Sequence, residues 1–237
     1  MVQGRGGMGR HLGHAMIAAL LLLTVLSFGC SRGPSPQEII SKAANVAAEV
    51  SSYRSNTIMT QTSDGETTKW IVQSKYSAPG RYWDKASNNH GRWFETLVIG
   101  DKCYFRNWEE PEWHTPQFWS VWSALSLKEQ LDSISSLTDL ERLPDEAIDG
   151  VDCFHFGWEI DSASNIEKLK PHVPEPLLQE IGQISGRCEL WIAKDSYLVR
   201  QLKMETQSPE FESVAVTRFY DFNKEIQIKA PEPVDIR

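Results

Sequence analysis

The sequence predicts an α+β fold: one large, curved antiparallel sheet that forms an unclosed half-barrel, with helices covering the concave face. Three observations predict it. Segments with period-two alternation fill most of the chain after residue 52, separated by turn sequences such as "SDGE", "SAPG" and "NNHG". An amphipathic helical pattern precedes these segments. Two further helical patterns interrupt them, and they are the available cover for an apolar sheet face.

The helical pattern at the start of this region runs from Pro36 to about residue 51, and the strand patterns then form a long meander. The strand patterns of this meander cover residues 53–62, 67–76, 81–83, 92–99 and 102–108. The remaining segments are a helical stretch at 117–134, strands at 138–143 and 151–160, a helical stretch at 162–182, and strands at 187–193, 197–206 and 211–223. The proline-bearing tail at 229–237 is expected to run over the surface.

Residues 1–29 are typical of a bacterial lipoprotein signal peptide. Arg5 and Arg10 precede an apolar run at 15–28, fourteen residues of which two are polar. A membrane span needs about 20 apolar residues, whereas the apolar region of a signal peptide needs roughly 7–15. The run ends in Gly-Cys, which resembles the end of a lipobox, whose cysteine is lipidated and becomes the mature N-terminus. We therefore expect cleavage before Cys30.

Lipidated Cys30 would anchor the chain to the bacterial cell membrane from the extracytoplasmic side, through acyl groups such as palmitate. Residues 30–36 have the composition of a short tether, and residues 37–237 are expected to form a single domain. A plain secretory signal or an uncleaved anchor is the alternative, because Phe28 is bulky where a lipobox commonly has a small residue.

The charge balance of the mature chain disfavours nucleic acid as a partner. Residues 30–237 contain 22 basic and 32 acidic residues, a net charge near −10, and no basic stripe. No metal site or other cofactor is expected, because the chain has no Cys-x-x-Cys and its histidines are scattered. No nucleophile elbow, P-loop or zinc-protease motif occurs, so we do not expect an enzyme.

Cys103, Cys153 and Cys188 all lie in apolar, strand-like contexts. Buried free thiols are the simplest interpretation. A disulfide between Cys103 and Cys153 is the alternative, because an extracytoplasmic location permits one.

Several segments resemble bacterial lipoproteins of the LolA-like superfamily, in particular the LppX/LprG type. They are "SSYR", "SAPGRYW", "ETLVIGDKCYFR", "IDGVDCFHF" and "CELWIAKDSYLVRQLKME", and the resemblance spans roughly residues 36–230. It implies a half-barrel whose apolar cavity binds a lipid or an acyl chain for transport or presentation. It also leaves open an envelope sensor or interaction lipoprotein that regulates a membrane partner; that protein partner is not identified. No named binding residue follows from the resemblance.

Candidate ligand-contacting residues come from the sequence pattern itself. Four tryptophans and Phe118 fall within the fifteen residues from 108 to 122. Of these, Trp119 and Trp122 would form an aromatic lip of the cavity or pack a helix onto the sheet. The strand alternation gives further candidates for the concave wall, although a cavity wall and an ordinary core face have the same alternation. These candidates are Trp70, Val72, Tyr82, Leu97, Phe154, Phe156 and Trp191.

Overall fold

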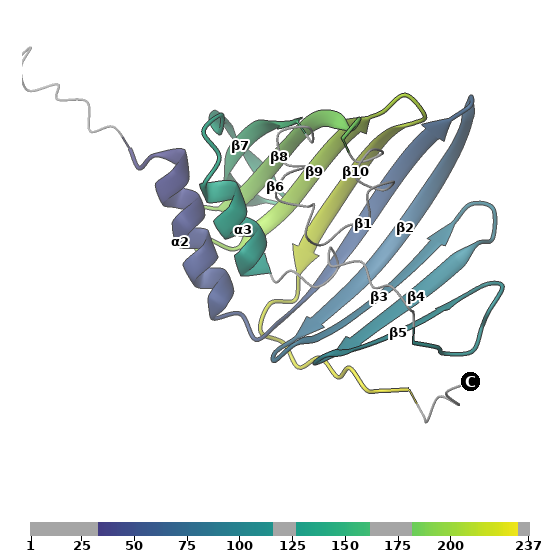
Figure 1. Ribbon diagram of the computed structural model, residues 1–237. Helices are drawn as coiled ribbons and strands as arrows, with labels where there is room; N and C mark the ends of the chain where they lie inside the picture. The colour runs from purple at the N-terminus through teal and green to yellow at the C-terminus, as the bar shows by residue number, and fades with distance from the viewer. Residues whose placement is uncertain (1–32, 116–126, 162–181, 232–237) are drawn as a thin grey trace, which may run out of the picture. The chain divides into compact units, whose positions relative to one another are not determined.

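The computed structural model describes residues 33–115, 127–161 and 182–231. From Pro36 onward the chain forms one compact unit. Its described helices are α2 (Pro36–Ala48) and α3 (Leu127–Ser135), shown in Figure 1. Its strands are β1 (Ser52–Ser63), β2 (Glu66–Ser77), β3 (Arg81–Asn88), β4 (Trp93–Ile99), β5 (Lys102–Asn107), β6 (Glu141–Ile148), β7 (Val151–Asp161), β8 (Ser185–Ala193), β9 (Val199–Gln207) and β10 (Glu212–Tyr220).

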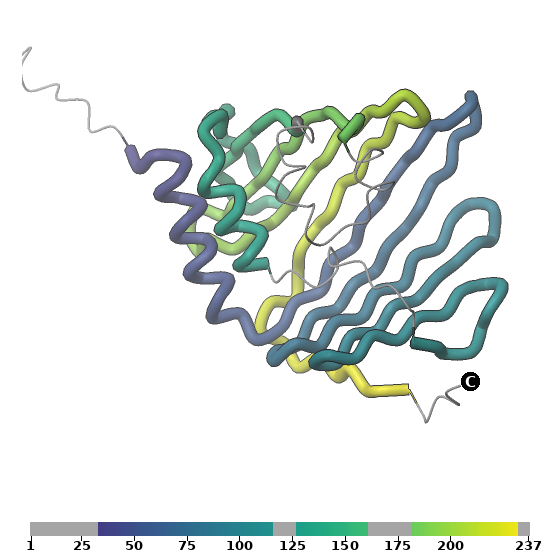
Figure 2. The backbone as a smooth tube through the Cα atoms, in the orientation of Figure 1, coloured from purple at the N-terminus to yellow at the C-terminus, as the bar shows by residue number. Residues whose placement is uncertain are grey.

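All ten strands form a single antiparallel sheet in the order β5-β4-β3-β2-β1-β10-β9-β8-β7-β6. It consists of two five-strand meanders, β1–β5 and β6–β10, which are joined where β1 pairs with β10 (Figure 2). The edge strands β5 and β6 are not paired with each other, so the sheet is unclosed. The predicted α+β fold with an unclosed, curved antiparallel sheet is thereby confirmed.

Two hairpins show how short turn sequences set the pairing register. Asp64-Gly65 joins β1 to β2, and Asp149-Gly150 joins β6 to β7. All four residues have positive φ, between 51° and 79°. Such two-residue turns match the right-handed twist of the flanking strands, which explains the preference for Asp-Gly at this position.

Helix α2 begins at Pro36, whose fixed φ suits the first helical position, and Glu38 in its first turn complements the helix dipole. Ile39, Ile40, Ala43 and Ala44 recur at helical spacing and are buried. The helix ends at Ala48 rather than near residue 51 as predicted, because a tight last turn closes it: the amides of Glu49 and Val50 donate to carbonyls three residues back.

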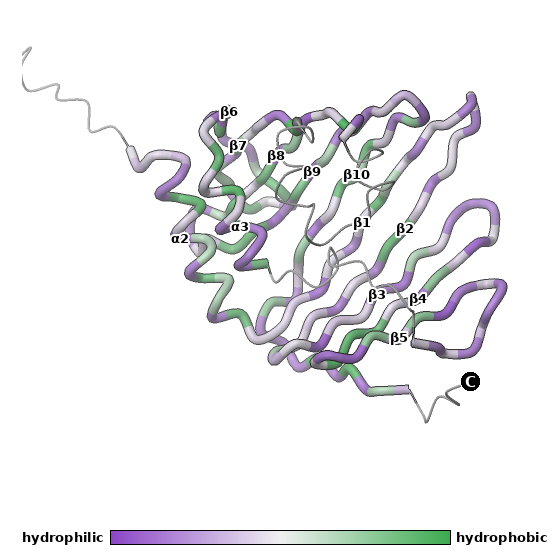
Figure 3. The backbone as a smooth tube through the Cα atoms, in the orientation of Figure 1, coloured by the Kyte–Doolittle hydropathy of each residue, from purple (hydrophilic) through white to green (hydrophobic). Residues whose placement is uncertain are grey.

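The two helices cover one half of one face of the sheet. Ile40 of α2 and Leu131 of α3 share the main core with Phe156 of β7 and with Leu190 and Ile192 of β8. Figure 1 shows both helices beside β6–β9 and displaced from β3, β4 and β5. Figure 3 shows hydrophobic stretches in α2 and also in β4 and β5. The described helices therefore leave a part of the sheet with apolar residues beyond their reach.

The segment after β10, residues 221–231, crosses the other face of the sheet, and we call it the C-terminal strap. Ile226 and Ile228 are 8% and 4% exposed and pack on Leu97 of β4. Its start is fixed by Asn223, whose amide donates to the Ser52 carbonyl. The surface course predicted for the tail applies to 229–231, since 232–237 lie outside the described residues.

The structure extends two strands well beyond their predicted ends: the strand predicted at 81–83 continues to Asn88 as β3, and β6 is also longer. We predicted a strand at 138–143 and a turn after it, whereas β6 continues to Ile148. A register shift between Leu143 and Glu146 accommodates Pro144, which has no amide to donate to the ladder. This is tolerated because β6 is an edge strand. The helical patterns at 117–126 and 162–181 lie outside the described residues.

Candidate ligand-binding face

The pairing register sorts the side chains of the sheet onto two faces. Tyr53 of β1 pairs with Tyr76 of β2, and both pack in the core that the helices share. Because side chains alternate along a strand, the face with Tyr76 also carries Val72 and Trp70. We call this face the helix side and the opposite face the outer side.

An aromatic row crosses the helix side over β2, β4 and β5, away from α2 and α3. We define it as Trp70, Phe94, Phe105 and His114. Successive ring centroids are 5.7, 6.3 and 5.4 Å apart, within the range of favourable aromatic contacts. All four side chains are only partly buried, so the row presents aromatic surface that a ligand can cover.

Ala86 of β3 explains how the row crosses an intervening strand. Ala86 is paired with Val72 on one side and Phe94 on the other, and it is 0% exposed. Its methyl group leaves the space in which the larger rings of Trp70 and Phe94 meet. The contact between the two rings therefore requires a small side chain at position 86.

A hollow of about 210 Å³ adjoins the row on the same face. Its walls come from β1, β2, β3, β9 and β10, and Gln130 of α3 contributes to one side. We call it the hydroxyl hollow, because four serine and threonine side chains and two tyrosines line it together with apolar groups. The lining residues from the strands are Tyr53, Ser55, Thr57, Val72, Ser74, Tyr82, Leu202, Thr217 and Phe219.

Four of the hydroxyl groups of the hollow form two hydrogen-bonded pairs. The oxygens Oγ1 of Thr57 and Thr217 are 2.7 Å apart across the β1–β10 junction. The Tyr82 hydroxyl donates to Ser74 Oγ over 3.2 Å. Burial, with a smaller contribution from Asp84, raises the pKa of Tyr82 to about 12. The hollow is thus lined by neutral groups that both donate and accept hydrogen bonds.

Asp84 lies on β3 between Tyr82 and Ala86, and so at the border between the hollow and the row. It is 7% exposed and faces Ser74 and Thr96 in the register. Among the described residues, its Oδ1 atom has no hydrogen-bond partner. Burial, and to a lesser degree Glu95, raises the pKa of Asp84 to about 7.

Glu95 is also buried, but it lies on the outer side and its carboxylate is fully engaged. Oε2 accepts from Arg106 Nε at 2.8 Å, and Oε1 accepts from Trp83 Nε1 at 2.6 Å. A buried polar atom without a partner costs about 1–3 kcal/mol. The contrast makes the free oxygen of Asp84 the exceptional feature of this face.

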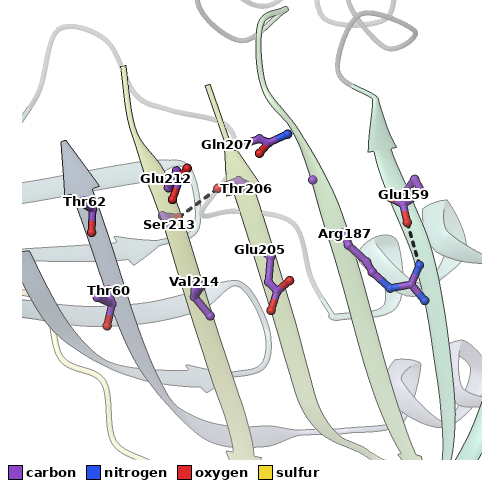
Figure 4. A pocket seen from close by; sticks show the side chains of 11 residues that line it. Thr60, Thr62, Glu159, Arg187, Glu205, Thr206, Gln207, Glu212, Ser213 and Val214 are labelled. Carbon is purple, nitrogen blue, oxygen red and sulfur yellow. Dashed lines mark hydrogen bonds and ion pairs between the residues drawn. The ribbon is translucent and has the colours of Figure 1, made fainter. Parts of the chain in front are cut away.

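A larger hollow, about 510 Å³, lies on the outer side near the ends of β7–β10. Figure 4 shows its charged lining, in which Arg187 faces Glu159 with Glu205 close by. The Arg187 guanidinium donates to Glu159 at 2.7 Å and also binds Glu141. Because its lining includes this ion pair and the carboxylates of Glu205 and Glu212, this hollow fits an apolar ligand less well than the helix side does.

The structure brings three of the predicted cavity residues together on the part of the helix side that the described helices leave uncovered. Trp70 belongs to the aromatic row, and Val72 and Tyr82 line the hydroxyl hollow. Phe156 lies on the same face but is 0% exposed beneath the helices, and Phe154 packs beside that core. These two therefore serve as core residues in the structure.

Two predicted cavity residues were assigned to the wrong face. Leu97 pairs with Trp83 and points to the outer side, where it packs against the C-terminal strap. Trp191 also points outward, stacks on His155 at 4.2 Å and packs on Cys153. In both cases the pairing with the adjacent strands decides to which side of the sheet the residue points.

The expectation of buried free thiols is confirmed, and the alternative disulfide between Cys103 and Cys153 does not form. Cys103 lies on β5 and Cys153 on β7, in different meanders, and both are buried free thiols, as is Cys188. Trp119, Trp122 and the predicted lipidation site Cys30 lie outside the described residues.

Sequence reasoning missed several residues of this face. Phe94 and Phe105 complete the row, and Asp84 lies within "RYWDKAS", on the same strand parity as Tyr82. That parity was a usable signal, because it predicts a carboxyl group pointing to the same face as a predicted cavity residue.

Within the described ranges, no group of three or more metal-ligating side chains occurs, and no helix is long and apolar enough to cross a membrane.

Solved structures similar to this chain include lipoproteins and LolA superfamily proteins. LppX from Mycobacterium tuberculosis is 15% identical, with a TM-score of 0.48 over 82% of this chain and 100% of that one. LprF from Mycobacterium bovis is 13% identical, with a TM-score of 0.49 over 84% and 98%. A LolA superfamily protein from Nitrosomonas europaea is 11% identical, with a TM-score of 0.34 over 83% and 96%. No protein-family model and no curated protein matches this chain.

Proposed function

We propose that the protein is an extracytoplasmic lipoprotein, anchored to the cell membrane through Cys30, that binds a hydrophobic ligand for transport or presentation. The ligand is a lipid or an acyl chain, and the binding requires no catalysis. The observation that carries this proposal is the aromatic row on the part of the helix side that lies away from α2 and α3.

The physical basis is burial of apolar surface. Each methylene group that leaves water contributes about 0.8 kcal/mol, and aromatic rings supply large contact areas at little entropic cost. Trp70, Phe94 and Phe105 are half-buried without a ligand, so covering them adds to the stability of a complex. The adjoining hollow gives the same ligand a place for a polar end.

Extraction of the purified protein tests the proposal directly. The chain from residue 31 onward, which retains the whole compact unit from Pro36, is expressed without the signal peptide. An organic extract is then analysed by mass spectrometry, and we expect close to one lipid per protein molecule. A domain that is isolated empty and captures no added lipid would exclude the carrier and favour an interaction lipoprotein.

A pair of neighbouring variants localises the ligand. Trp70→Ala removes a ring of the row, whereas Ile71→Ala changes the next residue, which is 43% exposed on the outer side. We expect Trp70→Ala to lower the amount of co-purified lipid about tenfold and Ile71→Ala to leave it unchanged. Equal retention by both variants would place the ligand elsewhere.

The anchor is tested separately in the full chain. Cys30→Ala should move the protein from the membrane fraction to the soluble fraction of a bacterial host, because its acyl chains supply the attachment. If the variant remains in the membrane fraction, the lipobox assignment is wrong and the apolar run is an uncleaved anchor.

A further inference from the structure

A carboxyl group at the border of an apolar binding face constrains which ligands the face accepts. Asp84 is more than nine-tenths buried, and its Oδ1 atom has no hydrogen-bond partner among the described residues. Its neighbours on the helix side, Ser74 across the strand pair and Tyr82 along the strand, both line the hydroxyl hollow. Asp84 itself does not line the hollow, but its unpartnered acceptor is buried next to two residues that do.

We propose that the hydroxyl hollow and Asp84 together bind an uncharged headgroup that carries hydroxyl groups, such as a glyceryl or sugar group. This inference rests on the proposed function and specifies the ligand class of that same face. The acyl chain lies along the aromatic row and the headgroup occupies the hollow. When the hydrogen-bonded side chains of Ser74 and Tyr82 move aside, a hydroxyl of the headgroup donates to the buried Asp84 Oδ1.

The composition of the hollow supports a neutral headgroup. Ser55, Thr57, Ser74 and Thr217 supply hydroxyls, which match the donor and acceptor pattern of a polyol. No lysine or arginine is among the described residues that line it. An anionic headgroup would find no cation there and would meet the carboxylate of Asp84.

The size of the hollow agrees with this assignment. Its volume of about 210 Å³ exceeds the roughly 30 Å³ that one water occupies in the liquid. That is room for a small headgroup, whereas an acyl chain requires the adjoining row. The ligand is therefore amphipathic, with its two ends on two defined parts of one face.

The proposal is tested with two probes that share one acyl chain. Delipidated protein, from residue 31 onward, is titrated near pH 8 with monolauroylglycerol and with laurate, each below its critical micelle concentration. We expect the glyceride to bind at least about tenfold more tightly, because only its headgroup is neutral and donates hydrogen bonds.

Asp84→Asn keeps the shape of the side chain and removes the charge. We expect laurate to bind several-fold more tightly to this variant, so that the difference between the two probes falls to about threefold or less. Asp101→Asn, the same substitution at an exposed turn residue, should leave the difference in affinity as it is in the unaltered protein.

An independent variant, Thr217→Val, removes one hydroxyl of the hollow. It should weaken the binding of the glyceride and leave the binding of laurate unchanged.

Two results would overturn the assignment while leaving the proposed function intact: equal binding of both probes by the unaltered protein, or an unchanged difference in Asp84→Asn. Failure of the unaltered protein to bind either probe would overturn the proposed function and this inference together.

Discussion

At the scale of single residues, Asp84 has a measurable effect on stability. Its pKa is about 7 in the folded protein, against 3.8 for the unperturbed group, so the folded state binds more protons between these values. Stability therefore falls as pH rises from about 4 to about 7, and above pH 7 ionised Asp84 costs about 4 kcal/mol. Ionised Asp84 therefore lowers the stability of the fold, and a strongly perturbed pKa of this kind is common at functional sites.

Asp84→Asn removes this penalty, so we expect the variant to be more stable than the unaltered protein at pH 8. The gain in the free energy of unfolding from Asp84→Asn should be about 2–3 kcal/mol larger at pH 8 than at pH 5. Urea unfolding at pH 5 and at pH 8 measures the free energy of unfolding of both proteins. Asp101→Asn is the matched control, and its unfolding curves should follow those of the unaltered protein. An equal effect of Asp84→Asn at both pH values would show that the carboxyl group is not buried in the folded state.

At the scale of elements, the sequence predicted which segments are strands better than which way each residue faces. The alternation in β2 is clear, and it placed Trp70 and Val72 on the correct face. In β4, Leu97, Val98 and Ile99 are consecutive apolar residues, because one face meets the aromatic row and the other meets the C-terminal strap.

A strand that is covered on both faces loses its alternation, so its sequence alone does not assign a face. The same holds for "LWIA" in β8, where Trp191 lies over Cys153 on the outer side. The register between strands, which depends on residues far away in sequence, decides such cases.

One glycine in β8, Gly186, allows the backbone of β9 to approach closely. A β-carbon at Gly186 would lie 1.9 Å from the carbonyl oxygen of Glu205 on β9, so the backbone itself would have to move. Gly186→Ala should lower the free energy of unfolding by about 1–3 kcal/mol or more, the usual cost of overpacking. Denaturant unfolding checks this, and Gly33→Ala is the control because no atom lies within 4 Å of its added β-carbon. A Gly186→Ala protein of unchanged stability would mean that β8 and β9 are further apart.

At the scale of the whole molecule, the two meanders are joined by the pairing of the first strand with the last. β1 pairs with β10 over nine residue pairs, from Arg54–Tyr220 to Thr62–Glu212. The C-terminal strap continues from β10 and reaches the β1–β5 meander on the outer side. There Ser52 Oγ donates to the Lys224 carbonyl at 2.5 Å, and Arg81 donates to the Ile228 carbonyl at 3.4 Å. The strap thus links the last strand to the meander that carries the aromatic row.

The strap should therefore govern the local stability of β3–β5 more than that of the helix-covered half. In the double variant Ile226→Ala and Ile228→Ala, each substitution removes a nearly fully buried side chain, at about 2–5 kcal/mol each if the site does not collapse. We expect amide hydrogen exchange to accelerate in β3, β4 and β5, while β7 and β8, which pack beneath α2 and α3, retain their protection. Val214→Ala, at a 41% exposed residue on the outer side, serves as the control and should leave exchange unchanged throughout. Uniform acceleration over all ten described strands would instead mean that the two meanders open only together, and that β3–β5 cannot loosen without global unfolding.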